Sequence, residues 1–245
     1  MKFSIITAVY NRERTIGDAM RCLQAQRFED YEHIVVDGAS SDRTLERVRA
    51  LADARTVLIS EPDDGIYDAI NKGIARASGD VVGLLHSDDL LADDHVLERV
   101  AQAFARDRCL IAYGDLDYIG ELDDHVVRRW RAGAFRPERL RRGWMPPHPT
   151  VFAAREVFEE QGAYDTSYRI AADYEAMLRY LQAFGDRVTY IPETLVRMRL
   201  GGASNKSVRA LARKMGEDYR SMRRHRVGGV PVLLWKSLSK LTQFV

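Results

Sequence analysis

The sequence predicts an α/β protein with a mostly parallel central sheet flanked by helices. Short β-branched runs alternate with longer amphipathic segments over the first 120 residues, which is typical of βαβ units. Polar and acidic side chains directly follow the predicted strands, where open α/β sheets bind their ligands. The composition agrees, because 46% hydrophobic and 30% charged residues in a chain of 245 exclude a disordered protein.

The first half contains elements in regular alternation. Apolar, β-branched runs predict strands at residues 2–9, 33–37, 56–60, 80–85 and 109–113. Segments with helical periodicity separate these runs and predict helices near 14–26, 42–53, 66–77 and 94–106. We expect right-handed crossovers between the strands, as in almost all parallel sheets.

The second half is less regular. Residues 115–150 mix short strands with Gly, Pro and Arg, and residues 144–149 are too rich in proline for a regular element. Helices are expected near 155–161 and 173–184, and a strand near 188–191. A further amphipathic helix is predicted over 207–225, with an apolar stripe formed by Val208, Leu211, Met215, Tyr219 and Met222.

The charge is unevenly distributed, although the net charge is only +1. Residues 197–245 hold twelve Lys or Arg against Glu217 and Asp218, and apolar residues alternate with lysines over 230–245. We therefore expect a basic amphipathic C-terminal tail, residues 206–245, that contacts an anionic membrane surface. A solvated helix face is the alternative, and a homodimer through the apolar stripe stays open.

Two further classes of protein lose support, and the cysteines indicate a compartment. No apolar run approaches the roughly 18 residues that span a bilayer, because the longest is interrupted at Lys236. A nucleic-acid partner is not expected, since aromatic and arginine side chains do not interleave into a stacking surface. Cys22 and Cys109 lack metal-site spacing and fit a reducing compartment, so we expect a cytoplasmic protein, peripheral at the inner face of the cell membrane.

Acidic residues at the strand ends point to metal and phosphate chemistry. Asp88 and Asp89 follow a buried strand, and paired carboxylates there suit Mg²⁺ or Mn²⁺ bridging to a diphosphate. Capping of the next helix is the alternative function of this pair. The turn after the first strand lacks the glycines that wrap a pyrophosphate, so a diphosphate would need a cation here.

Several enzyme signatures are missing from the chain. It contains no G-x-x-x-x-G-K-[ST], no G-x-G-x-x-G after the first strand, no G-x-S-x-G and no H-E-x-x-H. Nucleoside triphosphate hydrolysis, NAD-dependent transfer, serine hydrolysis and zinc proteolysis are therefore disfavoured.

Five segments together resemble family 2 glycosyltransferases: IITAVYN at 5–11, VVDGASSD at 35–42, DGIYDAINKG at 64–73, SGD at 78–80 and SDD at 87–89. The third is similar to bacterial polysaccharide-assembly enzymes. The resemblance implies a GT-A fold over residues 1–205 and a nucleotide-sugar donor whose expected nucleotide is UDP. It also implies a divalent metal (Mn²⁺ or Mg²⁺) and inversion at the anomeric carbon. It also implies a nucleotide-sugar half, residues 1–114, and an acceptor half, residues 115–205.

The resemblance assigns roles to donor-side residues. It implies that Thr7, Val9 and Asn11 line the nucleoside pocket and that Asp37 hydrogen-bonds the base. Asp64 and Lys72 would lie near the nucleotide or sugar. Asp88 would bind the ribose or the metal, with Asp89 as the neighbouring metal ligand. The chain departs from the family at His86, where many members have another Asp, and a neutral imidazole is a poor Mg²⁺ ligand.

The acceptor side depends on residues of the second half. Asp173 matches the family's general base, although Ala172 replaces the Glu that usually precedes it. The alternative for Asp173 is helix capping. The remaining acceptor or diphosphate candidates, each with a plain structural alternative, are His148, Glu175, Arg199 and Ser204.

The sequence thus predicts an inverting, metal-dependent glycosyltransferase of cell-surface polysaccharide biosynthesis acting on a glycan or lipid-linked acceptor. A nucleotidyltransferase that makes nucleotide sugars, and a non-catalytic nucleotide-sugar-binding module, are the alternatives. The nucleotidyltransferase lacks the Gly-rich basic first loop that triphosphate chemistry uses.

Overall fold

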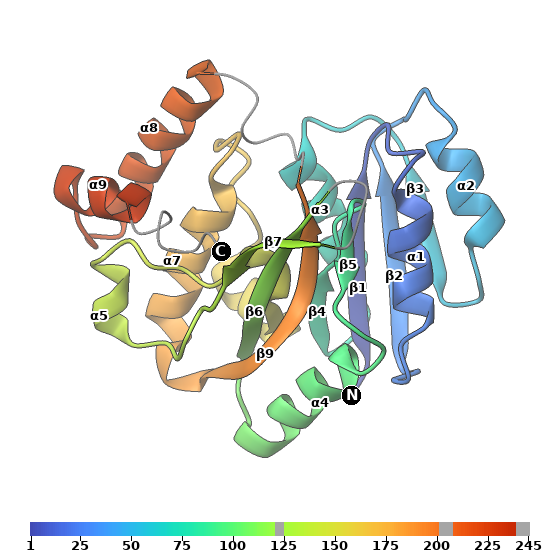
Figure 1. Cartoon of the computed structure of the whole chain (residues 1–245), viewed down its shortest axis with the longest axis horizontal. Coiled ribbons are helices and arrows are strands. Elements are labelled where there is room, and N and C mark those ends of the chain that lie inside the picture. The colour runs from blue at the N-terminus through green and yellow to red at the C-terminus, as the bar shows by residue number, and fades with distance from the viewer. Residues whose placement is uncertain (121–124, 201–207, 239–245) are drawn as a thin grey trace.

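One sheet runs through the molecule, and helices cover both of its faces (Figure 1). In residues 1–120, 125–200 and 208–238, which this computed structural model describes, nine strands join in the order β3-β2-β1-β4-β8-β6-β9-β5, with β7 paired to β6. The strands are β1 (Phe3–Val9), β2 (Tyr31–Asp37), β3 (Thr56–Ser60), β4 (Val81–Leu84), β5 (Asp89–Leu91), β6 (Ile111–Ile119), β7 (Val126–Trp130), β8 (Phe152–Ala154) and β9 (Val188–Arg199).

The helices follow the predicted order. They are α1 (Ile16–Gln24), α2 (Thr44–Leu51), α3 (Ile66–Arg76), α4 (Val96–Asp107), α5 (Pro137–Leu140), α6 (Arg155–Gln161), α7 (Ala172–Phe184), α8 (Val208–Arg224) and α9 (Val230–Leu238). Two 3-10 turns, η1 (His148–Thr150) and η2 (Gly185–Arg187), complete the elements. The proline-rich segment expected to lack regular structure contains only η1.

The α/β fold with a parallel first half is confirmed. Strands β1, β2, β3 and β4 pair in parallel, and a helix connects each to the next in the chain. The second half is mixed, because β8 pairs antiparallel with β4 and β6, while β6 and β9 are parallel. The hairpin β6–β7 and the pair β5–β9 are also antiparallel. A short connection such as that between β6 and β7 cannot make a parallel crossover, which needs a dozen or more residues.

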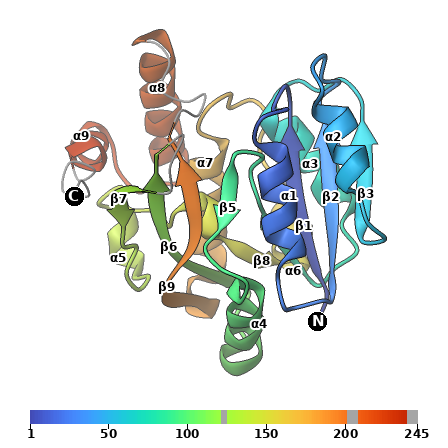
Figure 2. The ribbon, with the colours of Figure 1, turned by 45° about the vertical axis from the view of Figure 1, so that its right-hand side comes forward.

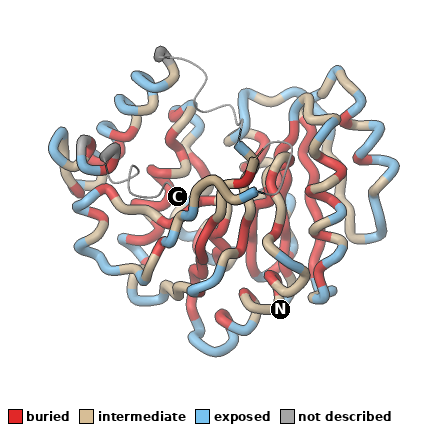
Figure 3. Tube along the Cα trace, viewed as in Figure 1, coloured by how far each residue is buried: buried red, intermediate tan, exposed pale blue. Residues whose placement is uncertain are grey.

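Alternation along β1 divides the core into two layers. Ile6 and Ala8 pack with residues of α3 and α7 on one face. Phe3 and Ile5 pack with α1 and α4 on the other face. This period of two matches the pleat of a strand that is covered on both sides. Buried positions accordingly run along the central strands, and exposed ones gather on the helices and loops (Figure 3).

The C-terminal helices pack against the second half of the body, beside α7 (Figures 1 and 2). Met222 of the predicted apolar stripe is fully buried, but Leu211, Met215 and Tyr219 stay exposed at 54%, 36% and 38%. The face of α8 that docks is instead largely polar, and it carries Glu217, Asp218 and Ser221. The sequence left open what covers the stripe, and most of its described part does not dock on the body.

Lys236 also differs from expectation. It was counted among the cations of the tail, but its side chain is buried and pairs with Asp218 at 2.9 Å, and its Nζ lies 3.1 Å from the centroid of the Tyr174 ring. Within the described part of the chain, the helices are all too short or too polar to cross a membrane.

Candidate active site

The candidate site is built from segments that follow β1, β2 and β4 and from the starts of α3 and α7. Because β1, β2 and β4 are parallel, their carboxyl ends meet at one edge of the sheet. Four of the five motif segments contribute residues to this edge, and the second half adds His148, Tyr164 and Asp173 to it.

The loops after β1 and β2 are tied together at Asn11. Asn11 has a positive φ of 50°, which an Asn tolerates better than most residues. Its backbone amide donates to Ser40 Oγ at 2.9 Å, and its Oδ1 accepts from the Ser41 amide at 2.9 Å. Asn11 therefore fixes the loop after β1 against the loop after β2.

Asp37 ends β2 in a fully buried position. Its carboxylate accepts hydrogen bonds from the Ser40 amide at 3.2 Å and from the Ser60 hydroxyl at 2.8 Å. The next residue, Gly38, has no room for a side chain, because a Cβ there would collide with the carboxylate of Asp63. The structure thus holds Asp37, Gly38 and Asp63 together at the end of β2.

Thr7 and Val9 lie in the core and do not line an open pocket. Thr7 is fully buried, donates to the Leu85 carbonyl at 2.8 Å and lies 2.9 Å from His33 Nε2. Val9 packs with α1 and α2 residues. Both point to the α1 face of β1 because every second residue of a strand shares one face. We had expected them to line the nucleoside pocket, but the pleat turns them inward.

Asp64 lies in the loop between β3 and α3, and Lys72 lies in α3. Lys72 is not free to meet a phosphate in this structure, because its Nζ pairs with Glu61 at 2.9 Å and with Asp68 at 3.3 Å. Asp64 is exposed, and its backbone carbonyl accepts from Arg169 at 2.6 Å. Both residues fasten the loop that enters α3.

Asp88 and Asp89 are adjacent but have different environments. The Asp88 side chain is 29% exposed, and its carboxylate lies 3.9 Å from Arg12 Nε. Asp89 begins β5 at 1% exposure, and neither of its oxygens has a hydrogen-bond partner among the described residues. Burial and the charge of Asp88 raise the pKa of Asp89 well above its usual range, although Arg199 nearby opposes them. Of the two, only Asp88 has a solvent-accessible carboxylate.

A divalent cation fits Asp88 better than the predicted pair. No group of three or more His, Cys, Asp or Glu side chains within the described residues could hold a metal alone. An accessible carboxylate with a diphosphate as co-ligand is nevertheless the usual Mg²⁺ or Mn²⁺ arrangement. Asp88 offers that carboxylate, whereas the enclosed oxygens of Asp89 do not reach the edge of the site.

Two histidines meet beside the acidic residues. The rings of His86 and His148 are 6.1 Å apart, and His148 Nε2 lies 2.8 Å from the Tyr164 hydroxyl. Burial lowers the pKa of His148 to about 4, against the opposing charge of Asp173. Burial likewise lowers the pKa of His86, although Asp88 and Asp173 oppose it. Both rings are therefore neutral at physiological pH and can take part in hydrogen bonds without adding charge.

Asp173 lies in the first turn of α7. The Tyr67 hydroxyl shares its single hydrogen between the Ile170 carbonyl at 2.8 Å and Asp173 Oδ1 at 3.3 Å. Its negative charge acts on both histidines and on Tyr67. The predicted base is therefore next to the residues that follow β4, although 84 residues separate Asp89 from Asp173 in the chain.

Sequence reasoning did not assign roles to Tyr67 and Asn71, which connect the two halves of the chain. The Tyr67 ring stacks on Tyr164 at 5.8 Å, and Asn71 exchanges two hydrogen bonds with the Tyr164 backbone at 2.8 and 2.9 Å. Both lie in the DGIYDAINKG segment, four residues apart on one face of α3. That spacing was the available signal.

Glu175 is neither a solvated residue nor an acceptor ligand. It is 1% exposed, and its carboxylate pairs with Arg179 and with His225, each at 3.0 Å. Burial disfavours its charge, but the hydrogen bonds from His225 and Arg179 prevail and lower its pKa. Glu175 follows Asp173 by two residues, so the two side chains point to roughly opposite sides of α7. Glu175 therefore faces α8, and the expectation that it orients the acceptor is wrong.

Arg199 and Ser204 complete the predicted set. Arg199 is held by Asp18 of α1 at 3.1 Å, so its guanidinium is committed in this structure. Ser204 lies outside the residues that the structure describes.

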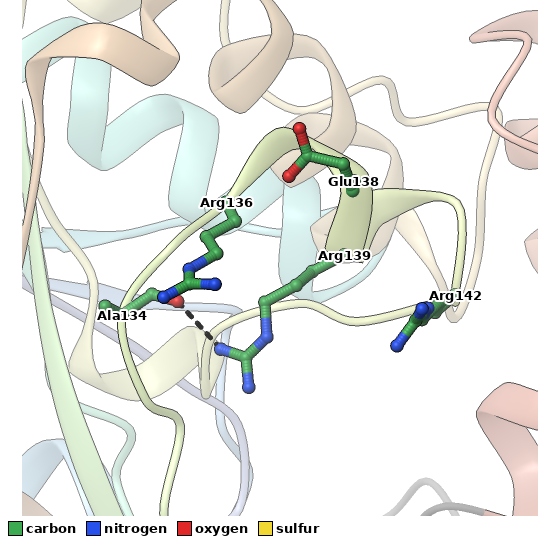
Figure 4. Close-up of a pocket in the computed structure, with 5 residues that line it drawn as sticks. All are labelled: Ala134, Arg136, Glu138, Arg139 and Arg142. Atoms are coloured by element: carbon green, nitrogen blue, oxygen red, sulfur yellow. Dashed lines mark hydrogen bonds between the residues drawn. The ribbon is translucent and has the colours of Figure 1, made fainter.

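A separate pocket of about 470 Å³ lies at α5, lined by Ala134, Arg136, Glu138, Arg139 and Arg142. Figure 4 shows Arg139 hydrogen-bonded to the Ala134 carbonyl, with the Arg136 guanidinium group beside the same residue. Arg139 also lies over the Trp144 ring at 5.1 Å.

Comparison with known proteins identifies the family of the chain. Residues 4–161 match the model of glycosyl transferase family 2. An uncharacterised glycosyltransferase of Mycobacterium tuberculosis is 31% identical over 189 residues, covering 72% of this chain and 67% of the relative. A PGL/p-HBAD biosynthesis glycosyltransferase of Mycobacterium bovis is 30% identical, with 72% and 68% covered.

Solved structures share the fold at low sequence identity. TarS of S. aureus (residues 1–349, with UDP-GlcNAc) superimposes with a TM-score of 0.69 at 19% identity, covering 93% of this chain and 66% of TarS 1–349. The mannosyltransferase PcManGT of Pyrobaculum calidifontis, solved with GDP-Man and Mn²⁺, gives 0.68 at 17% identity, with 96% and 69% covered. The chain spans 39% of a longer TarS chain.

The fold is that of the GT-A type of glycosyltransferases. The chain belongs to glycosyl transferase family 2.

Proposed function

We propose that this chain is an inverting, metal-dependent glycosyltransferase that moves a hexose from a nucleoside diphosphate donor, UDP-linked, to a glycan or lipid-linked acceptor of cell-surface polysaccharide synthesis. Asp173 is the general base. The observation that carries the proposal is the position of Asp173 beside Tyr67 and within electrostatic reach of both His86 and His148. The donor class is supported by neighbours solved with UDP-GlcNAc and with GDP-Man.

The roles follow from the contacts. Asp173 takes the proton of the attacking acceptor hydroxyl, while Tyr67 fixes its carboxylate by a hydrogen bond. Asp88 would hold the divalent cation, which neutralises the departing diphosphate when bound. Neutral His148, hydrogen-bonded to Tyr164, shapes the wall between Asp173 and His86. Asn11 and Asp37 form the nucleoside end.

A nucleotide-binding assay followed by turnover tests the proposal. Thermal shift with UDP, GDP, dTDP and CMP, each with and without Mn²⁺, names the nucleotide, because a bound ligand raises the melting midpoint. Release of that nucleotide from its sugar donors is then measured. We expect Asp173→Asn to lower turnover by about 10² to 10⁴ while nucleotide binding is unchanged, and Asp88→Asn to abolish the Mn²⁺-dependent part of the shift.

A matched control distinguishes the base from another carboxylate of this region. Asp186→Asn removes an exposed carboxylate of η2, at the opposite end of α7 from Asp173, and should leave turnover within about twofold, since it lies outside the proposed machinery. Equal loss in both variants, or turnover that persists in Asp173→Asn, refutes the assignment. The anomeric configuration of the product, read from its proton NMR coupling, tests inversion. If the protein binds nucleotide but turns over none of the donors, the binding-module alternative is favoured. Release of pyrophosphate would favour the nucleotidyltransferase.

We also propose that the C-terminal helices hold the enzyme peripherally at an anionic cytoplasmic membrane face. Support comes from exposed apolar side chains beside basic ones: Leu211, Met215 and Tyr219 on α8, and Trp235 at 58% exposure on α9. The division into body 1–205 and tail 206–245 remains part of this proposal. The full chain should sediment together with vesicles that contain phosphatidylglycerol, and the double variant Leu211→Glu/Trp235→Glu should stay in the supernatant. Equal sedimentation of the two proteins contradicts the proposal. Sedimentation equilibrium of the same variants tests the homodimer.

A further inference from the structure

Glu217 of α8 contacts the start of α7, the helix that carries Asp173. Its Oε1 accepts the backbone amide of Arg169 at 3.0 Å, and its Oε2 accepts the amides of Ile170 and Ala171 at 2.8 and 2.9 Å. One carboxylate thus binds three consecutive peptide N–H groups. These amides immediately precede Ala172, the first residue of α7.

The N-cap side chain of α7 does not hold the start of the helix. Ser, Thr, Asp or Asn at the N-cap usually bonds an amide of the first turn, but the N-cap of α7 is Ala171, which makes no side-chain cap. The three hydrogen bonds of Glu217 go to the segment that leads into the helix, residues 169–171. A carboxylate near a helix N-terminus is also favourable in charge. From 46 residues further along the chain, Glu217 thus fixes the entering segment and places a negative charge at this end of α7.

Two other residues of α8 hold the same segment. Arg220 donates to Ser167 Oγ at 2.7 Å and lies 3.7 Å from the centroid of the Tyr168 ring. Arg224 pairs with Asp165 at 2.9 Å. The loop 165–171 is therefore fastened to α8 along its length.

The opposite side of this loop forms the candidate active site. Tyr67 donates to the Ile170 carbonyl at 2.8 Å and to Asp173 Oδ1 at 3.3 Å. Ile170 is thus held from both sides: its backbone N–H donates to Glu217, and its carbonyl accepts from Tyr67. The entry of the chain into α7, and with it the direction of the Asp173 side chain, is set between these two contacts.

We propose that Glu217 is a positioning residue for the general base: by binding the amides of residues 169–171, it fixes the first turn of α7 and holds Asp173 toward the acceptor hydroxyl. This inference rests on the proposed function of Asp173. It makes α8 part of the catalytic apparatus, although Glu217 itself touches neither donor nor acceptor.

The test uses the full chain with two substitutions. Glu217→Gln keeps the size of the side chain but places an N–H₂ group against amide donors, and Glu217→Ala removes all three hydrogen bonds. Misplacement of a catalytic group by about 1 Å costs on the order of 10² in rate. We therefore expect kcat for donor turnover to fall about 10-fold to 100-fold in both variants, while the dissociation constant of the nucleotide, measured by calorimetry, changes less than about twofold. Glu160→Gln, on the exposed surface of α6, is the matched control and should behave as the wild type.

A double-mutant cycle separates positioning from general stabilisation. If Glu217 acts through Asp173, Glu217→Gln lowers the residual turnover of Asp173→Asn by less than about twofold, since the group that it positions is already gone. Equal losses in both backgrounds, or loss of nucleotide binding together with kcat, overturn the proposal. A kcat within twofold of wild type in both variants overturns it as well.

Hydrogen exchange gives a readout that does not depend on turnover. The amides of Arg169, Ile170 and Ala171 should exchange at least about tenfold faster in Glu217→Gln, with exchange in β1 and β4 unchanged. If the wild type turns over no donor, the proposed function fails and positioning of a base fails with it, whereas accelerated exchange would still assign Glu217 to the α7 cap. Unchanged exchange of the three amides removes the structural basis of the inference.

Discussion

The Glu32 cluster, at the opposite end of β2 from Asp37, allows a stability prediction that needs no substrate. Glu32 is 9% exposed. It accepts hydrogen bonds from Ser4 Oγ at 2.5 Å, from the Ser78 amide at 2.7 Å and from Lys2 Nζ at 3.2 Å. Burial disfavours its charge, but the bonds from Ser4, Ser78 and Lys2 prevail and lower its pKa to about 2.

The magnitude follows from linkage between protonation and folding. A pKa lowered from 4.5 to about 2 corresponds to roughly 3 kcal/mol of preferential stabilisation of the ionised side chain in the folded state. Because the folded pKa is depressed, this stability is fully present above about pH 4.5 and is lost as the pH falls toward 2. We expect Glu32→Gln to lower the free energy of unfolding by roughly 2 to 3 kcal/mol at pH 7, and the difference from wild type to shrink below about pH 4.5.

Urea unfolding followed by circular dichroism at pH 7, 5, 4 and 3 measures the difference directly. Glu46→Gln is the control, because Glu46 forms an exposed ion pair with Arg43, and such pairs contribute at most about 1 kcal/mol. The reasoning is refuted if Glu32→Gln costs less than 1 kcal/mol at pH 7, or if its cost is the same at pH 3 as at pH 7.

Three further predictions concern the core and the C-terminal packing. Gly83→Val should lower the free energy of unfolding by about 1 to 3 kcal/mol, because a Cβ at Gly83 would lie 2.5 Å from Phe152 Cε1; a urea midpoint equal to wild type would contradict this. Burial lowers the pKa of His33 to about 4, so the unfolded chain takes up a proton that the folded one refuses, and stability falls as the pH drops from 6.5 to 4; His33→Gln should flatten this limb in acid titrations followed by fluorescence. Lys236→Ala should destabilise the chain by about 3 kcal/mol, since it leaves Asp218 buried without its ion-pair partner, and should expose α9 to chymotrypsin; an unchanged melting midpoint and digestion pattern would argue that α9 docks by its apolar contacts alone.

Much of the fold and part of the site could be predicted from the sequence. The alternation of apolar runs placed β1 to β4 and the helices between them, because a strand covered on both faces and an amphipathic helix have distinct periodicities. Motif spacing predicted that Asn11, Asp37 and Asp88 lie at one edge of the sheet, since parallel strands end together, and the structure has them at the ends of β1, β2 and β4. The identity of Asp173 as the candidate base came from its motif and from its place at a helix start.

The errors share one cause, which is that local sequence does not say what lies across from a side chain. Thr7 and Val9 match the family motif, but the pleat of β1 directs them into the core. Glu175 follows Asp173 by two residues, so a helical turn carries it to the opposite side, against Arg179 and His225. Asp88 and Asp89 look equivalent in sequence, and only the pairing of β5 with β9 encloses Asp89.

The sequence by itself determined the α/β class, the order of elements and the family, because these depend on periodicity and on motifs within short stretches. Only the tertiary structure decided which residues meet across long separations: Tyr67 with Asp173, Asn71 with Tyr164, and Glu217 with the first turn of α7. The apolar stripe of α8 could be predicted from the sequence, but the face of α8 that docks is the one with Glu217 and Asp218. Buried backbone amides and a buried lysine are costly without carboxylate partners, and this cost exceeds the gain from burying more apolar surface on the body.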